Sequence, residues 1–171
     1  MSQLKVNSII PVGGIPTSGG NVYGGGIIQI VQNETQTQAA ITSTSYTDIG
    51  LSATITPTST SSKILVICDV QFRVFIASTD NSTAFTVLRG STAIKNPTGD
   101  YELQYNARQA YSHTSGTSNR ASVHILDSPS TTSATTYKVQ AKMRTVEAGN
   151  SVDYQDDSAY KSYITLYEVS A

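Results

Sequence analysis

The sequence predicts an all-β protein, an antiparallel β-sandwich of jelly-roll type with an extended, glycine-rich N-terminal arm. Three observations support this prediction. Many short segments alternate apolar and polar residues, which is the pattern of a strand with one buried face. Threonine is abundant, and it suits the solvent face of a sheet because it is β-branched and polar. No segment combines helical spacing of apolar residues with a capping residue before it.

Residues 1–25 differ from the rest and predict an N-terminal attachment arm. A short apolar strip is followed by a glycine-rich stretch with two prolines. Such a segment has too few apolar groups to offset its own ordering entropy, so we expect a neighbouring subunit to hold it. The alternative is that it folds back on its own domain. The residues expected to anchor the arm are Leu4, Val6, Ile9, Ile10, Pro11 and Val12.

Residues 26–171 are expected to form one β-sandwich domain, because 171 residues leave little room for a second core. The strongest strand is predicted over residues 63–76, where every even-numbered position is apolar. Leu65 and Ile67 lie on the other face of this strand. The strand should therefore begin covered on both sides and end covered on one.

The other strands are predicted from shorter patterns. Residues 83–88 and 92–95 should form a hairpin, because the glycine of Gly90-Ser91 fits a tight turn. Residues 96–120 have the weakest pattern and predict one strand with a long loop. Further strands are expected over 27–31, 51–56, 121–126, 137–144 and 162–169.

Composition argues against nucleic-acid and membrane partners. The net charge is −1, and the 11 lysines and arginines are scattered singly along the chain. A phosphate-binding groove or an anionic membrane requires a cluster of basic residues. No apolar run approaches the length that crosses a bilayer, and the N-terminus lacks the pattern of a secretory signal. We therefore expect the protein to be made in a cytoplasm and to stay soluble there.

Residues that could carry chemistry are few, and they predict no catalytic, cofactor or metal site. Cys68 is the single cysteine and is expected to be a buried small hydrophobe. His113 should lie in a polar loop and His124 in a partly exposed strand. Asp153, Asp156 and Asp157 lack the pattern of a calcium loop, so a solvated loop is expected there.

Tyrosine is the aromatic residue that stands out, with 10 copies in the chain. Tyrosines outside core patterns can act as rigid contact residues, because they combine an apolar ring with a hydroxyl. The alternative is that most of them lie in the core or at a subunit interface. The candidate surface-contact residues are Tyr101, Tyr105, Tyr111, His113, Tyr154 and Tyr160.

Six segments of the chain together form a recognisable pattern: residues 4–13, 49–57, 61–66, 88–94, 126–137 and 164–169. In these segments the chain resembles virion proteins of tailed phages, especially those that infect marine cyanobacteria, which are described as tail-fibre or structural proteins. The resemblance spans nearly the whole sequence. These segments are structural signatures, so they indicate membership of this class of virion proteins better than they indicate a function.

The resemblance implies a β-sandwich head that forms homotrimers and an N-terminal segment that attaches to other virion proteins, on the tail or the capsid. The expected function is a non-enzymatic, fibre-like appendage or adhesion module of the virion, assembled in the host cytoplasm. A host surface glycan is a candidate partner. Fibre proteins with this opening often carry several modules, whereas this chain has one.

Two other functions stay open at this stage. A single module also fits a capsid decoration protein, which clamps capsid subunits. A glycan-degrading enzyme would need a pair of carboxylates at the spacing of glycoside hydrolysis. The sequence offers only loosely placed acids for that role, such as Asp153, Asp157 and Glu168.

Overall fold

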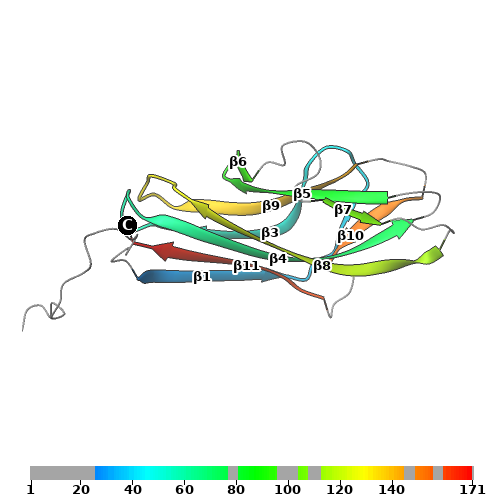
Figure 1. Ribbon diagram of the computed structural model, residues 1–171, viewed down its shortest axis with the longest axis horizontal. Coiled ribbons are helices and arrows are strands. Elements are labelled where there is room, and N and C mark those ends of the chain that lie inside the picture. Colours follow the sequence, from blue (N-terminus) through cyan, green and yellow to red (C-terminus); the bar gives the residue numbers. More distant parts are fainter. Residues whose placement is uncertain are drawn as a thin grey trace, which may run out of the picture.

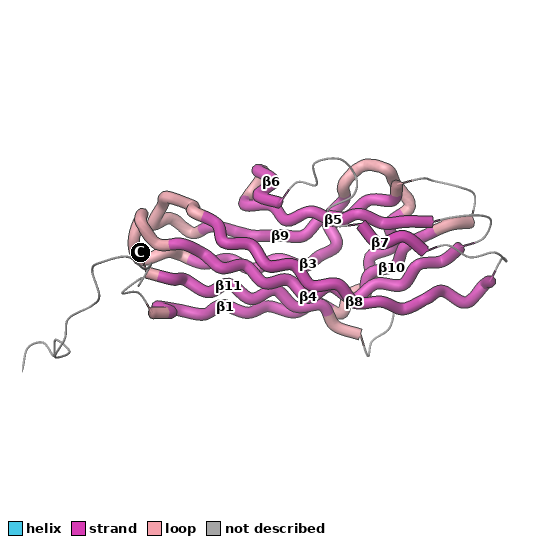
Figure 2. Tube along the Cα trace, viewed as in Figure 1, coloured by secondary structure: helices cyan, strands magenta, loops and turns pink. Residues whose placement is uncertain are grey.

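The computed structural model describes residues 26–76, 81–95, 104–107, 113–144, 149–155 and 160–170. Their strands form two antiparallel sheets that pack face to face, so the predicted β-sandwich is confirmed (Figure 1). Every regular element of the described part is a strand, as Figure 2 shows. The predicted N-terminal arm lies outside the described residues.

Within the described residues, the first sheet has six strands and the second has five. The six-stranded sheet consists of β1 (Ile27–Thr35), β2 (Ala39–Ile41), β4 (Lys63–Ile76), β8 (His113–Asp127), β10 (Ser151–Tyr154) and β11 (Ser162–Val169). The five-stranded sheet consists of β3 (Thr47–Ile55), β5 (Asn81–Arg89), β6 (Thr92–Lys95), β7 (Gln104–Ala107) and β9 (Thr135–Met143).

The strand pairs are nested in the way that defines a jelly roll. The first strand pairs with the last, β3 pairs with β9, β4 pairs with β8, and β5 pairs with β6 and β7. A long hairpin that folds over itself gives this order, with two Greek keys in two sheets. The short strands β2 and β10 are an addition: β10 pairs with β2 on one side and with β4 on the other.

Alternating side chains of β4 form the centre of the core, as their spacing predicts. Ile64, Val66, Cys68, Val70 and Phe72 are all fully buried. They face the inward side chains of β3, β5 and β9 from the second sheet. The bounds of β4 and β11 agree with the predicted strands, and the predicted hairpin is present as β5 and β6. Gly90 in its turn has φ 58°, a conformation that favours glycine.

The structure corrects two predictions about polar segments. Strand β8 begins at His113, well before the predicted start at residue 121. Its first half has a polar sequence and is held by backbone pairing with the second half of β4. Asp153 was expected in a solvated loop; it lies within β10 between β2 and β4 and is 9% exposed.

Candidate assembly surface

The outward face of the six-stranded sheet carries an apolar row that crosses four strands. Ile30 of β1 is opposite Tyr167 of β11, Tyr167 is opposite Leu65 of β4, and Leu65 is opposite Leu126 of β8. Ile30 is 58% exposed and Leu126 is 59% exposed. Aligned cross-strand side chains lie close enough to form one continuous surface.

Exposed apolar residues are also present at the beginning of β1, at the end of the sheet where the C-terminus lies (Figure 1). There Ile27 is opposite Val169, and the register of β1 shifts between Ile27 and Gln29. Ile27 and Ile28 are both exposed, at 60% and 44%. Contiguous exposed apolar residues on a soluble protein mark an interaction site more often than isolated ones do.

The outward side of β4 is partly covered at Leu65 and Ile67. The sequence predicts that this part of β4 is covered on both sides. The second sheet covers the inward face, and Leu65 and Ile67 on the outward face are half-buried. The predicted cover is therefore only partial on the outward side.

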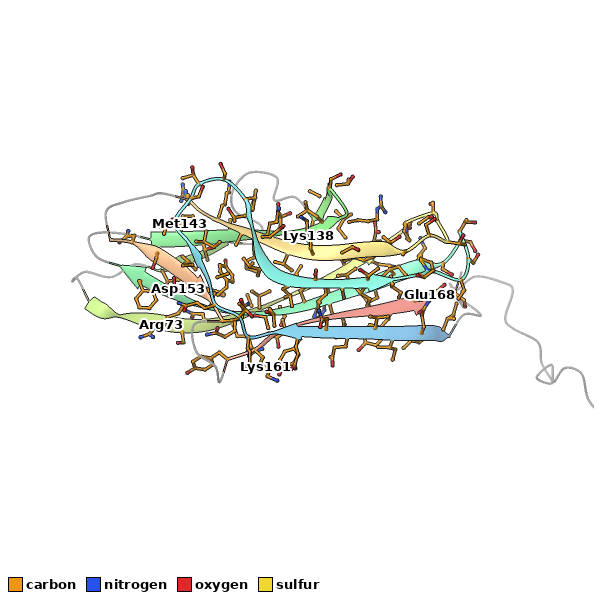
Figure 3. The ribbon with its side chains drawn as sticks, turned by 180° about the vertical axis from the view of Figure 1, so that it is seen from behind. Arg73, Lys138, Met143, Asp153, Lys161 and Glu168 are labelled. Carbon is orange, nitrogen blue, oxygen red and sulfur yellow. The ribbon has the colours of Figure 1, made fainter. Side chains whose placement is uncertain are left out.

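Charged residues on the outward face of the six-stranded sheet include two pairs of opposite sign. Arg120 forms an ion pair with Asp69 at 2.9 Å, and Lys161 forms one with Glu34. In Figure 3, Lys161 projects away from the second sheet. Each pair is close to neutral as a unit.

The outward side of β9, on the other sheet, carries polar and charged side chains. Lys138 pairs with Asp48 at 3.0 Å, and Gln140 donates a 2.8 Å hydrogen bond to the same carboxylate. Lys142 lies over the ring of Tyr46, 4.9 Å from its centroid. This face is polar, so the two outer faces of the sandwich differ.

A shallow depression lies where β10 and β11 adjoin the same edge of β4. The β11 pairing with β4 ends at Asp69, and the β10 pairing begins at Phe72. The depression has a volume of about 270 Å³. It is lined by Gln71, Ser118, Asn119, Arg120 and Tyr160.

Gln71 is held firmly by its backbone at this junction. Its N–H donates a 2.9 Å hydrogen bond to Oγ of Ser162, and its carbonyl accepts a 3.3 Å bond from the N–H of Gln155. Gln155 has φ 53°, which is rare for a residue with a side chain. Its Nε2 donates to Oγ of Ser162 at 2.6 Å, and this bond supports the turn.

Glu168 anchors the C-terminal end of the sandwich (Figure 3). Its fully buried carboxylate accepts hydrogen bonds from Nε2 of Gln29 at 2.6 Å and from the N–H and Oγ1 of Thr58, both at 2.7 Å. Burial alone would raise the pKa of Glu168, but the hydrogen bonds it receives lower the pKa to about 2. Glu168 is therefore a structural anion and not a proton donor near neutral pH.

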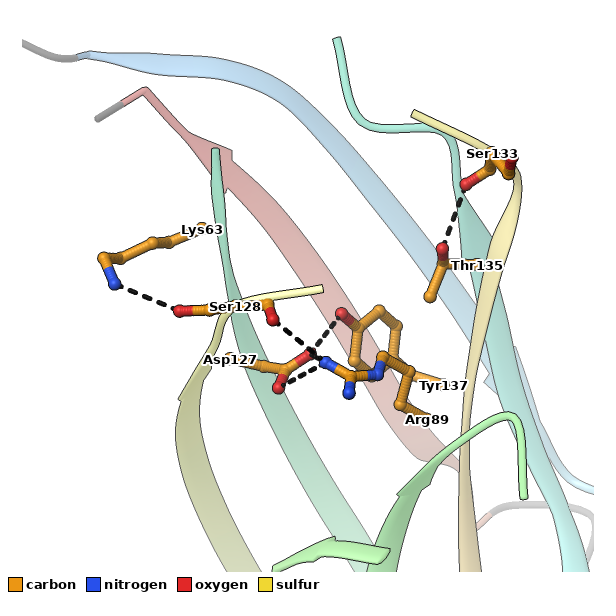
Figure 4. Close-up of polar contacts among 7 residues, drawn as sticks. All are labelled: Lys63, Arg89, Asp127, Ser128, Ser133, Thr135 and Tyr137. Carbon is orange, nitrogen blue, oxygen red and sulfur yellow. Dashed lines mark hydrogen bonds and ion pairs between the residues drawn. The ribbon is translucent and has the colours of Figure 1, made fainter. Parts of the chain in front are cut away.

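A second polar cluster joins the two sheets at the same end (Figure 4). Nη1 of Arg89 in β5 donates to both carboxylate oxygens of Asp127 in β8, at 2.9 and 2.8 Å. The hydroxyl of Tyr137 in β9 donates to Oδ2 of Asp127 at 2.7 Å. Every charged group of this cluster has a partner within the fold, which is typical of a structural role.

The predicted surface-contact residues have different outcomes. Tyr154 is fully buried, packs against Phe72 and shares a 2.7 Å hydrogen bond with Oγ1 of Thr83, so its predicted surface role is wrong. Tyr160 is 41% exposed and lines the depression. Tyr105 lies in β7, and His113 is the first residue of β8; the side chains of both lie outside the described part.

The other predicted site residues are Tyr101 and Tyr111 and the anchoring residues Leu4, Val6, Ile9, Ile10, Pro11 and Val12, and all of them lie outside the described residues. The outward apolar row was not among the predicted sites. Its signal was the pair Leu65 and Ile67 on the second face of the strongest strand.

Among the described residues, no group of histidine, cysteine or acidic side chains could hold a metal ion. Cys68 is buried as predicted, and burial raises the pKa of its thiol to about 12. No helix of the described part is long and apolar enough to cross a membrane.

Comparisons with known proteins give little beyond this geometry. No family model and no curated protein sequence matches the chain. A structural comparison aligns the chain with dimeric latent PorU from Porphyromonas gingivalis at a TM-score of 0.42 and 10% sequence identity. The alignment covers 84% of this chain and 13% of the PorU chain.

Proposed function

We propose that this protein is a non-enzymatic structural module that assembles with copies of itself through the outward face of the six-stranded sheet. The observation that carries the proposal is the cross-strand row of Ile30, Tyr167, Leu65 and Leu126. Ile30 and Leu126 at its two ends are exposed, and Tyr167 and Leu65 between them are half-buried. Fully burying one large aliphatic side chain stabilises a complex by about 1.5–3 kcal/mol. Burial of the two exposed aliphatic residues of the row, Ile30 and Leu126, therefore supplies part of an assembly free energy.

A second copy suits this face for an electrostatic reason. Copies of one chain repel each other if their contact surfaces carry unbalanced charge of the same sign, and burying an unpaired charge is costly. Much of the charge on this face is compensated within each copy by two ion pairs, Arg120 with Asp69 and Lys161 with Glu34. When two copies approach, each of these charges is therefore already neutralised by a partner in its own copy.

The sequence resemblance supports the wider setting. It implies a homotrimer within a tailed-phage virion, as a fibre-like appendage or adhesion module that residues 1–25 anchor to other virion proteins. A host surface glycan remains a proposed partner of such a module. The alternative is a capsid decoration protein.

Self-assembly is tested by sedimentation velocity of the full chain over a wide concentration range. The parent protein should sediment as a trimer of the 18.2 kDa chain. Leu65→Arg should dissociate it, because a charge would enter the apolar row. Gln140→Arg, on the polar face of the other sheet, is the matched control and should assemble normally. A parent protein that is monomeric throughout would refute the proposal.

The virion setting is tested by locating the chain in an electron-microscopy map of the intact particle. Copies on the tail in multiples of three support an appendage or adhesion role. A lattice of copies over the head supports the decoration alternative.

A further inference from the structure

The side-chain amide of Gln71 is buried without a hydrogen-bond partner in the described part of the chain. Gln71 lies on β4 with 3% of its surface exposed. Neither Nε2 nor Oε1 of its carboxamide has a hydrogen-bond partner among the described residues. Buried amide groups are nearly always paired in folded proteins, because leaving a donor and an acceptor unpaired forfeits their bonds to water.

A second unpaired atom lies on the same face. Asp69, two residues before Gln71 on β4, bonds to Arg120 through Oδ2. Its Oδ1 is buried and has no partner in the part of the chain that is described. Residues two apart in a strand point to the same side. The outward face of β4 thus offers one donor and two acceptors that the chain leaves unused.

Space for a partner is present beside Gln71. Gln71 and Arg120 both line the depression of about 270 Å³, together with Ser118, Asn119 and Tyr160. The depression lies on the outward face, further along β4 than the apolar row at Leu65. A glutamine side chain has three rotatable bonds, so a change of rotamer can turn its amide toward an incoming group.

We propose that a second copy of the chain completes this polar site, with side chains that hydrogen-bond to the Gln71 carboxamide and to Oδ1 of Asp69. This inference rests on the proposed self-assembly and adds a specificity element to it. The apolar row supplies attraction, which depends little on alignment. The polar groups are satisfied in only one alignment of the copies, so they determine the register of the assembly.

The test compares two substitutions of similar chemistry in the full chain. Gln71→Met removes the amide while keeping much of the side-chain volume, and Gln140→Met makes the same change on the opposite sheet. Sedimentation equilibrium gives the self-association constant of each variant, and thermal unfolding of dilute, dissociated protein gives the stability of the single chain. Gln71→Met should weaken self-association at least tenfold without lowering the Tm of the dissociated chain. Gln140→Met should leave self-association unchanged.

The outcomes separate the two proposals. If the parent assembles, Leu65→Arg dissociates it and Gln71→Met assembles as tightly as the parent, the inference is wrong and the proposed function stands. If Gln71→Met lowers the Tm of the dissociated chain as much as it weakens assembly, Gln71 acts within its own chain and the inference fails. A parent that never assembles refutes both.

Discussion

The hydroxyl of Tyr137 donates a 2.7 Å hydrogen bond to Oδ2 of Asp127, and this bond joins β9 of one sheet to β8 of the other. The same carboxylate accepts two hydrogen bonds from Arg89. Burial, and then the carboxylate of Asp127, raise the pKa of Tyr137, so the tyrosine stays protonated over a wide pH range. One acidic side chain therefore links three strands from both sheets.

Removing parts of this cluster should destabilise the fold in a graded way. Tyr137→Phe removes one hydrogen bond to a charged group and should lower the free energy of unfolding by about 1–3 kcal/mol. Asp127→Ala should cost more, because it leaves both Arg89 and Tyr137 without their shared acceptor. Urea unfolding measures both changes. Equal midpoints for the two variants and the parent would show that the cluster contributes nothing.

Glu168 should make stability depend on pH in the acid range. Its pKa is about 2 in the folded chain, against 4.5 for an unperturbed glutamate. A lowered folded-state pKa contributes stability above the unfolded value, and that contribution is lost as pH falls. The free energy of unfolding should therefore decrease between about pH 4.5 and pH 2, as measured by urea unfolding at several pH values.

The matching variant is Glu168→Gln. It places an amide N–H₂ against donors from Gln29 and Thr58, so it should lower stability at pH 7 by about 1–3 kcal/mol. The difference between parent and variant should shrink as pH falls through the same range. A difference that stays constant from pH 7 to pH 2 would contradict this role for the carboxylate.

Tyr154 and Tyr160 should respond very differently to truncation. Tyr154→Ala leaves a cavity in the core beside Phe72 and should cost about 3–5 kcal/mol of stability. Tyr160→Ala changes an exposed side chain and should stay within about 0.5 kcal/mol of the parent. Thermal or urea unfolding distinguishes the two. A large loss of stability in Tyr160→Ala would indicate packing that its exposure does not show.

Cys68 should be inert in the folded protein. Its side chain is buried in the core, and burial raises the pKa of the thiol to about 12, so very little thiolate forms at neutral pH. A chromogenic disulfide reagent should label the native chain slowly and the urea-unfolded chain rapidly. Equal rates under the two conditions would mean that β4 opens readily.

The strands with strict alternation could be located from sequence, and polar strands could not. Residues 63–76 alternate so regularly that the predicted strand has the bounds of β4. The first half of β8 shows no such alternation, because its residues are mostly polar. Those residues form a strand through backbone hydrogen bonds to β4, which depend on a segment far away in the sequence.

The apolar row, too, could be predicted from the sequence only in part. The sequence placed Leu65 and Ile67 on the second face of their strand. It could not show that these residues align with Ile30, Tyr167 and Leu126, because cross-strand register joins segments that are distant along the chain. Tyr154 was misplaced for a related reason, since pairing of β10 with β4 buries it in the core.

The sequence by itself determined the all-β class, the centre of the core and the side of each alternating strand that is buried. These properties follow from a local period of two, which is written in consecutive residues. Only the tertiary structure decided which outer face carries the apolar row and that the buried amide of Gln71 lacks a partner among the described residues. Those properties arise from long-range backbone pairing and from the packing of one sheet on the other, which place residues side by side that the sequence keeps apart.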